Sequence, residues 1–229
     1  MSYKKFISTY EYGVDMGNIK YGILQNDFVI INNPKDEVEL DIIDTLLRKY
    51  KKLWLCEIFE DWQKYSIPDY ITHLCFDIND EINEPEIMNN LPQSLEFLSI
   101  MNYSFNGTLT NLPPNLKHLE IHSYYAFKQS LDFLPIGLET LVLNSCCGSV
   151  IINATFPPNL KTLVIKTRKM NGDYMHWSFG SSADDIRRTN LLLRNLPASL
   201  EYLYINDEKG AQKGVKEYLP NLKIRYIKN

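Results

Sequence analysis

Residues 112–121 read LPPNLKHLEI, and this decapeptide recurs along the whole second part of the chain. Each full copy follows the pattern apolar-Pro-x-x-[Leu/Ile]-x-x-Leu-x-[Ile/Leu/Phe]. The other full copies are IPDYITHLCF at 67–76, LPQSLEFLSI at 91–100, LPIGLETLVL at 134–143, FPPNLKTLVI at 156–165 and LPASLEYLYI at 196–205, and LPNLKIRYI at 219–227 is a shortened one. The repeat prolines stand at 68, 92, 113, 135, 157, 197 and 220, so neighbouring copies are 21 to 24 residues apart except for one gap of 40. A fixed period of this length predicts a solenoid, because each unit buries its apolar face only by stacking on its neighbours.

The second half of each copy predicts a short strand. In the copy at 112–121, Leu119 and Ile121 alternate with His118 and Glu120, and alternate residues of a strand point to opposite faces of a sheet. Stacked copies would each add one parallel strand, about 4.8 Å from the last. The prolines fit the turns that enter the strands. We therefore expect an α/β repeat solenoid with a curved parallel sheet of about seven to eight short strands and a mostly irregular convex side.

Residues 1–66 contain no copy of the repeat and are predicted to form a mixed α/β N-terminal cap, with the repeats occupying 67–229. Aromatic and β-branched residues within 3–32 predict two or three short strands that include a hairpin. Residues 37–51 have apolar residues at helical spacing, with acidic residues at the start and basic ones at the end, which the helix dipole favours. Residues 52–56 read as a first strand. A cap is expected because an uncovered solenoid end would expose apolar surface and a strand edge.

The gap of 40 residues between Pro157 and Pro197 predicts an insertion within 166–189. It contains Tyr174, His176 and Trp177, with Phe179 close behind. Long loops on a rigid scaffold often carry binding residues. We expect the 174–179 loop to contact a partner.

A second, weaker motif lies between the strands, as FNGTL at 105–109, FKQSL at 127–131 and INEP at 82–85. Together with the decapeptide it resembles the FNIP-repeat family, a relative of leucine-rich repeats found in social amoebae and in large DNA viruses of amoebae. The resemblance covers about 67–227. It implies a leucine-rich-repeat-like fold, a viral or amoebal origin, and protein recognition through the concave face of the sheet.

The composition excludes several classes of function. The chain of 229 residues has a formal net charge of −4, whereas nucleic-acid binding needs a basic surface. Its apolar runs are too short to cross a membrane, and residues 1–13 are not followed by the apolar segment of a signal peptide. The four cysteines, at 56, 75, 146 and 147, have no CxxC spacing and form no small disulfide scaffold. These features predict a cytoplasmic protein, in the host cytoplasm if it is viral, that binds neither nucleic acid nor membrane.

The outward strand positions are expected to form three columns on the concave face. The first contains Lys52, His73, Phe97, His118, Thr140, Thr162 and Tyr202; the second Trp54, Cys75, Ser99, Glu120, Val142, Val164 and Tyr204; the third Cys56, Asp77, Met101, His122, Asn144, Lys166 and Asn206. Aromatic, histidine and methionine side chains on an open sheet are typical of interface cores. The residues predicted to bind the partner are Trp54, His73, Phe97, Ser99, Met101, His118, Glu120, His122, Tyr202 and Tyr204. The alternative is that the cap or the insertion covers part of this face, which would make these residues part of a core.

His118, Glu120 and His122 share one face, which raises the question of a metal site. Alternate residues of a strand are about 6.6 Å apart, so two of them could share a zinc ion but all three would be strained. The neighbouring strands offer few further ligands. A glycine-rich phosphate loop, a GxSxG motif and a His-Cys pair at catalytic spacing are all missing from the sequence. We expect no cofactor, no metal and no enzymatic activity.

The sequence leaves two alternatives to simple recognition of a protein partner, itself a host or viral protein. Many FNIP-repeat chains follow an F-box, which would make this chain a substrate adaptor of a ubiquitin ligase, but residues 33–50 lack the Leu-Pro opening of that motif. The second alternative is a homo-oligomeric structural protein. A homodimer could pair at the last strand, although Lys223, Arg225 and Lys228 discourage edge pairing there.

Overall fold

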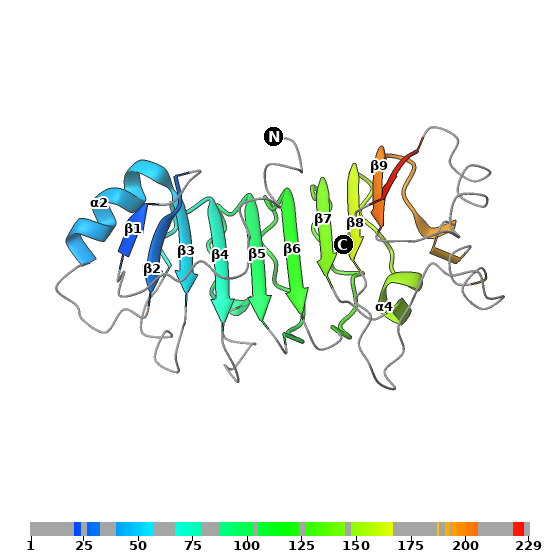
Figure 1. The fold of residues 1–229 in the computed structure, drawn as a ribbon, viewed down its shortest axis with the longest axis horizontal. Coiled ribbons are helices and arrows are strands. Elements are labelled where there is room, and N and C mark those ends of the chain that lie inside the picture. Colours follow the sequence, from blue (N-terminus) through cyan, green and yellow to red (C-terminus); the bar gives the residue numbers. More distant parts are fainter. Residues whose placement is uncertain are drawn as a thin grey trace.

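The computed structural model describes residues 21–23, 27–32, 40–56, 67–78, 88–102, 105–123, 127–144, 148–166, 187, 191–192, 194–205 and 222–226. Within these ranges ten strands form one sheet whose spatial order is the order of the sequence (Figure 1). The strands are β1 (Tyr21–Ile23), β2 (Val29–Asn32), β3 (Lys52–Cys56), β4 (His73–Ile78), β5 (Phe97–Asn102), β6 (His118–Ser123), β7 (Thr140–Asn144), β8 (Thr162–Lys166), β9 (Tyr202–Ile205) and β10 (Lys223–Tyr226). The predicted leucine-rich-repeat-like fold is confirmed.

The sheet is parallel except at its N-terminal end. β1 pairs with β2 in antiparallel fashion, as the predicted hairpin requires, and every later neighbour from β2 to β10 is parallel. The sequence led us to expect about seven to eight strands, and the structure has ten. The difference arises because β1 and β2 continue the sheet beyond β3 instead of forming a separate layer.

The prolines of the six full copies each begin a tight turn that leads into the next strand. The amide of Leu116, for example, donates to the carbonyl oxygen of Pro113 at 3.1 Å, and the same bond recurs in five other copies. The chain then meets the preceding unit, where one carbonyl oxygen accepts two amides. The amides of Lys117 and His118 both donate to the Glu96 oxygen, at 2.9 and 3.0 Å. The starts of β4 to β9 are therefore each fixed by the preceding unit.

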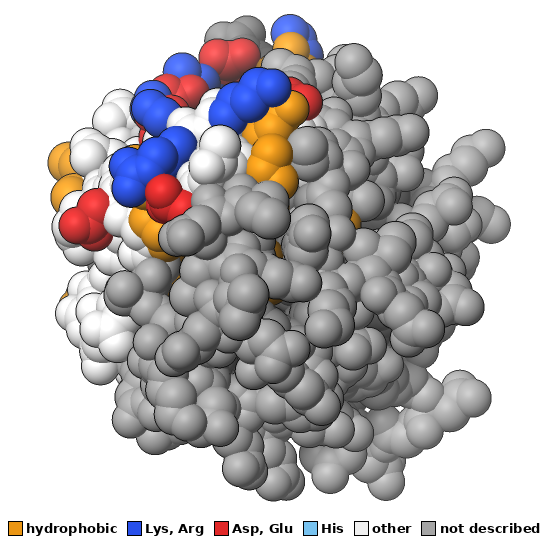
Figure 2. Space-filling view, turned by 90° about the vertical axis from the view of Figure 1, so that its left-hand side faces the viewer, with side chains coloured by type: hydrophobic (Ala, Val, Ile, Leu, Met, Phe, Trp, Pro, Cys, Tyr) orange, Lys and Arg blue, Asp and Glu red, His pale blue; other side chains and the backbone are white. Residues whose placement is uncertain are grey.

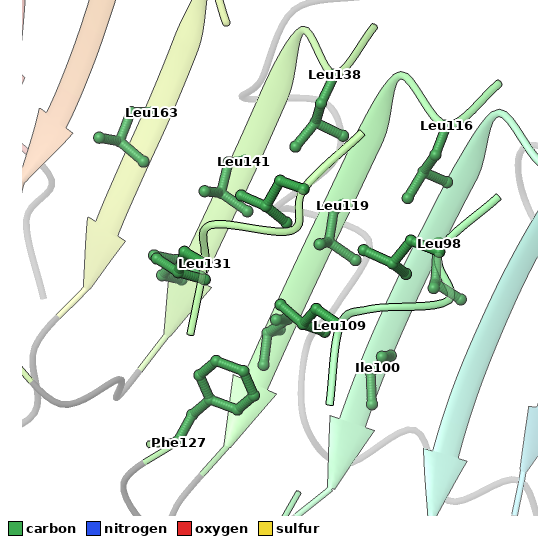
Figure 3. Packing of buried hydrophobic residues seen from close by; sticks show 14 of the residues in the cluster. Leu98, Ile100, Leu109, Leu116, Leu119, Phe127, Leu131, Leu138, Leu141 and Leu163 are labelled. Carbon is green, nitrogen blue, oxygen red and sulfur yellow. The ribbon is translucent and has the colours of Figure 1, made fainter. Parts of the chain in front are cut away.

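The hydrophobic core lies on the face of the sheet opposite the three columns. Leu98, Leu119, Leu141, Leu163 and Leu203 form a fully buried row at matching register positions. Figure 3 shows the strand leucines next to side chains from the connecting segments, among them Leu109, Phe127 and Leu131. Phe105 and Phe127 come from the second motif and stack with ring centroids 5.8 Å apart. The weak Phe-x-x-x-Leu motif thus supplies the layer that covers the strand leucines.

The described ranges include the helices α2 (Leu40–Tyr50) and α4 (Gly148–Ile152). Helix α2 lies within the helix predicted over 37–51. It is tied to the first repeat by Asp44, which accepts hydrogen bonds from Tyr70 Oη and Arg48 Nε. It ends at Tyr50, and the next residue, Lys51, has a positive φ of 57° where the chain turns into β3. Figure 2 looks onto this end of the molecule, where basic and acidic side chains lie side by side on the described surface.

Among the described helices, none is long and apolar enough to cross a membrane.

Candidate functional site

The strand register aligns the three outward columns across the sheet. In the first column Lys52 is paired with His73, His73 with Phe97, Phe97 with His118, and the row continues through Thr140 and Thr162 to Tyr202. In the second column Ser99 is paired with Glu120. In the third column Met101 is paired with His122, and His122 with Asn144. Strand alternation alone was sufficient to predict this arrangement.

The same face is much less exposed than the sequence led us to expect. Four of the predicted partner-binding residues are buried: Phe97, Ser99, Met101 and Glu120. The neighbouring Cys75, Val142 and Val164 are buried as well, so the second column is enclosed over β4–β8. For this column the burial favours the alternative of a covered face, which the sequence left open because alternation shows which side of the sheet a residue faces but not what packs against it. The other predicted residues are half-buried: Trp54, His73, His118, His122, Tyr202 and Tyr204.

A row of rings runs across the N-terminal half of the face. His73 and Phe97 stack with centroids 5.6 Å apart, and Phe97 and His118 stack at 4.6 Å. Phe28, which directly precedes β2, meets both His73 and Phe97 edge-on at 6.3 and 6.4 Å. Phe28 and Phe97 also pack with Cys75 and Trp54 in a small apolar cluster. This cluster explains the burial of Phe97 and Cys75.

Glu120 lies at the centre of the polar part of the face. Its Oε1 is 2.8 Å from Nε2 of His118, and its Oε2 is 3.1 Å from Nε2 of His122. Ser99 donates its hydroxyl to Oε2 at 3.4 Å. Asn144 Nδ2 lies 3.2 Å from Nδ1 of His122. A buried carboxylate is therefore held between two imidazoles, and its oxygens have hydrogen-bond donors from three side chains.

The electrostatics follow from this burial. Burial by itself raises the pKa of Glu120, but hydrogen bonds and electrostatic attraction from His118 and His122 outweigh it and lower the pKa to about 2. Burial lowers the pKa of His73, and nearby Lys52 lowers it further. Burial also lowers the pKa of Lys166, while attraction to Glu120 acts in the opposite direction. The carboxylate of Glu120 is consequently ionised at neutral pH.

The geometry of this group bears on the metal question. The two Nε2 atoms point at separate oxygens of Glu120, which lies between the rings. Across the described ranges no three or more His, Cys, Asp or Glu side chains are placed to hold a metal ion together. The arrangement holds rings and polar side chains in fixed positions around one buried negative charge, the carboxylate of Glu120.

Several predicted features lie outside the described residues. They include Tyr174, His176 and Trp177 of the predicted partner-binding loop, almost all of the insertion within 166–189, and Cys146 and Cys147. Of the four cysteines, Cys56 and Cys75 are described, and both are buried.

Sequence reasoning missed two features at the edge of the sheet where the proline turns lie. One is a pair of exposed apolar side chains, Phe133 and Ile136. The other is a set of bonds between units from the fourth position of the decapeptide: Asn115 donates to the Gln93 oxygen, Asn159 to the Ile136 oxygen, and Ser199 to the Leu160 oxygen. The sequence contains a pattern that could have predicted these bonds, since the fourth position is Ser or Asn in four of the six full copies.

Comparisons with known proteins address the fold. In a scan against family models, the one described as "FNIP Repeat" matches residues 63–103. Among solved structures, the crystal structure of CroV588, described as a novel circular LRR protein, is similar with a TM-score of 0.44 and 19% identity. The match covers 90% of this chain and 34% of that one, so this chain spans about a third of its length. Among the curated proteins compared, none matches the sequence.

The family match begins before the first full copy of the decapeptide and ends after the second, so it covers β4 and β5 and the segment that joins them. The same decapeptide precedes β6, β7, β8 and β9. The predicted resemblance to FNIP repeats is confirmed at residues 63–103, where the family model matches. The strands of that segment are part of a leucine-rich-repeat-like solenoid.

Proposed function

We propose that the chain is a non-enzymatic recognition module that binds a protein partner, of the host or of a virus, on the concave face of its sheet. The observation that carries the proposal is the row of half-buried rings along the first column, at His73, His118 and Tyr202. Rings of this kind offer a large apolar contact together with a polar atom, and they are enriched where proteins meet.

The burial of the second column refines which residues would meet the partner. Ser99 and Glu120 would act from below by holding His118 and His122 in place. The contact itself would come from the half-buried residues of the outer columns and from Tyr204. Tyr202 and Tyr204 stack with centroids 6.3 Å apart at the C-terminal part of the face. Such pre-ordered rings lose little side-chain entropy on binding.

Two further parts of the proposal rest on the sequence. The 174–179 loop, with Tyr174, His176 and Trp177, would add contacts beside the sheet. The compartment would be the cytoplasm, or the host cytoplasm for a viral protein. Support for a reducing compartment comes from the spacing of the four cysteines, which does not match a small disulfide scaffold.

The test is affinity capture from amoebal lysate with the wild type and with the double variant His73→Ala/Tyr202→Ala. These two side chains are half-buried and lie outside the Glu120 group, so the variant is expected to fold, as circular dichroism would verify. A matched control is Asn106→Ala/Lys128→Ala, which changes exposed residues of the connecting segments. A protein retained by the wild type and the control but lost from the double variant would support the proposal.

Two results would contradict it. If every captured protein bound the double variant as well as the wild type, the first column would not be the binding surface. If ubiquitin-ligase subunits were recovered equally with all three proteins, the adaptor alternative would replace a module that acts by binding alone.

A further inference from the structure

We propose that two copies of this chain associate through the edge of the sheet that carries the proline turns, around the boundary between β6 and β7. This turn edge is formed by the third residue of each decapeptide, and Phe133 directly precedes the decapeptide that contains Ile136. Before β5, β6, β7 and β8 these residues are Gln93, Pro114, Ile136 and Pro158.

Contacts between units show that the turn residues lie next to one another. Asn115 donates to the Gln93 oxygen at 3.2 Å, and Asn159 donates to the Ile136 oxygen at 3.0 Å. In the unit between them, a Cβ built on Gly137 would lie 3.8 Å from the Pro114 oxygen. Each turn therefore packs on the turn before it, and the third residues follow one another along the edge at the spacing of the strands, about 4.8 Å.

The middle of the turn edge is apolar and open. Ile136 is 71% exposed and Phe133 is 58% exposed, and Pro114 and Pro158 on either side of Ile136 are exposed as well. Single exposed apolar residues need no explanation, but neighbouring ones mark a contact surface. Among the described residues, Leu191 is the other large apolar side chain that is exposed.

A row of alternating charges accompanies the apolar residues. The residue just before each strand is Glu96 at β5, Lys117 at β6, Glu139 at β7 and Lys161 at β8. Lys117 pairs with Glu96 at 3.1 Å and Lys161 with Glu139 at 3.0 Å, and all four side chains are close to half exposed. The turn edge thus presents two acid–base pairs in the same order.

The order of these four charges along the edge is self-complementary under a two-fold rotation. A two-fold axis between β6 and β7 would set β6 against β7 of the second copy, and β5 against β8. Lys117 would then face Glu139 of the other copy, and Glu96 would face Lys161. One strand further out, Glu201 before β9 would face the neutral Thr72 before β4. Closed two-fold interfaces require a surface of this kind, on which every residue meets its complement.

The apolar residues obey the same symmetry. The axis would bring Ile136 of one copy against Pro114 of the other, with Phe133 beside them. A shift of the second copy by one strand would place like charges opposite each other, which costs free energy. The chemistry of this edge therefore selects a second copy of the chain in one register.

The edge is small compared with the surface of about 800 Å² per partner in a typical stable complex. We expect a weak dimer, with a Kd on the order of tens of micromolar.

The first experiment is sedimentation velocity of the full chain from low micromolar to several hundred micromolar concentration. The wild type is expected to dimerise as the concentration rises. Ile136→Lys should raise the Kd by about tenfold or more, since it places a charge in the apolar centre. Leu191→Lys is the matched control, because it puts the same side chain at an exposed leucine outside the decapeptides, and it should leave the Kd unchanged.

The second experiment tests the register. The fourfold variant Glu96→Lys, Lys117→Glu, Glu139→Lys and Lys161→Glu keeps both intramolecular pairs and all facing pairs of a homodimer. It should therefore dimerise as the wild type does. In a mixture with the wild type, however, like charges face each other, so native mass spectrometry should show mixed dimers well below the statistical half of all dimers.

Three results would overturn the proposal. They are a wild type that stays monomeric at every concentration, an Ile136→Lys variant with the Kd of the wild type, and mixed dimers at the statistical share. The last result would leave a dimer that forms elsewhere, for which the edge of β10 is the first place to look.

Discussion

The side-chain amide of Asn144 lies 3.2 Å from Nδ1 of His122 and thereby selects the tautomer of that ring. An amide nitrogen can only donate, so Nδ1 of His122 accepts. The proton of the neutral ring is then on Nε2, which faces Glu120 at 3.1 Å. One asparagine on β7 therefore aims a donor on β6 at a buried carboxylate.

Replacing Glu120 by glutamine should destabilise the fold. The amide nitrogen of Gln would present donors to an imidazole that already donates from Nε2, which leaves a buried polar group without its partner. The expected loss in the free energy of unfolding is about 1–3 kcal/mol. Urea denaturation measures it, with Glu139→Gln as the control. Glu139 makes an exposed pair with Lys161, so the control should change stability by less than about 1 kcal/mol.

An equal effect of the two substitutions would show that the Glu120 group contributes no more than a surface ion pair.

The same carboxylate should make stability depend on pH in acid. The pKa of Glu120 is lowered in the folded protein from 4.5 to about 2. Its contribution is therefore fully present above pH 4.5, and it is lost as the pH falls toward 2, because the unfolded chain binds the proton first. The difference in unfolding free energy between the wild type and Glu120→Gln should shrink over this range. A difference that stayed constant from pH 5 to pH 2 would mean that the folded and unfolded pKa values are alike.

The leucine row should tolerate truncation poorly. Leu119 is fully buried between Leu98 and Leu141 of the adjacent strands, so Leu119→Ala should leave a cavity and cost about 2–5 kcal/mol. Ile136→Ala is the control at a side chain that is 71% exposed, and it should change stability by less than about 0.5 kcal/mol at concentrations where the protein is monomeric. Thermal and urea unfolding of both variants test this. Similar losses for the two would contradict the described packing.

One substitution should stabilise the protein. Gly137 occupies the position at which the units on either side carry Asn115 and Asn159, and each of these donates to the preceding unit. A Cβ at Gly137 has its nearest contact at 3.8 Å, which leaves room for a side chain. Gly137→Asn should therefore add a hydrogen bond to the Pro114 oxygen and raise the unfolding free energy by about 0.5–1.5 kcal/mol.

Gly137→Ala separates the two causes, because it reduces the freedom of the unfolded chain without adding the bond. If the alanine variant were as stable as the asparagine variant, the bond would be absent.

The sequence predicted the sheet well because each unit repeats the same local information. The alternation of Leu119 and Ile121 with His118 and Glu120 was enough to assign both faces. It was not enough to predict that Glu120 and Ser99 are buried, since burial depends on what the rest of the chain packs against that face. Phe97 illustrates this best: its neighbours Phe28 and His73 are 69 and 24 residues away along the chain.

The exposed edge was missed for a different reason. Ile136 occupies a turn position at which the other full copies carry Asp69, Gln93, Pro114, Pro158 and Ala198. A consensus pattern keeps only what the copies share, so it contains no information about a residue that occurs in one copy. The residues in which one copy departs from the others are those most able to carry a function of their own.

The pairing of each strand with only its sequence neighbours has a consequence for how such a chain can change its length. The sheet order follows the sequence from β1 to β10, and one carbonyl oxygen of each unit starts the next strand. A duplicated unit between β5 and β8, where the repeat prolines are 21 or 22 residues apart, would meet on both sides the neighbours it already has. The solenoid could thus gain or lose whole repeats in its middle while the strands at either end of the sheet keep the neighbours they have.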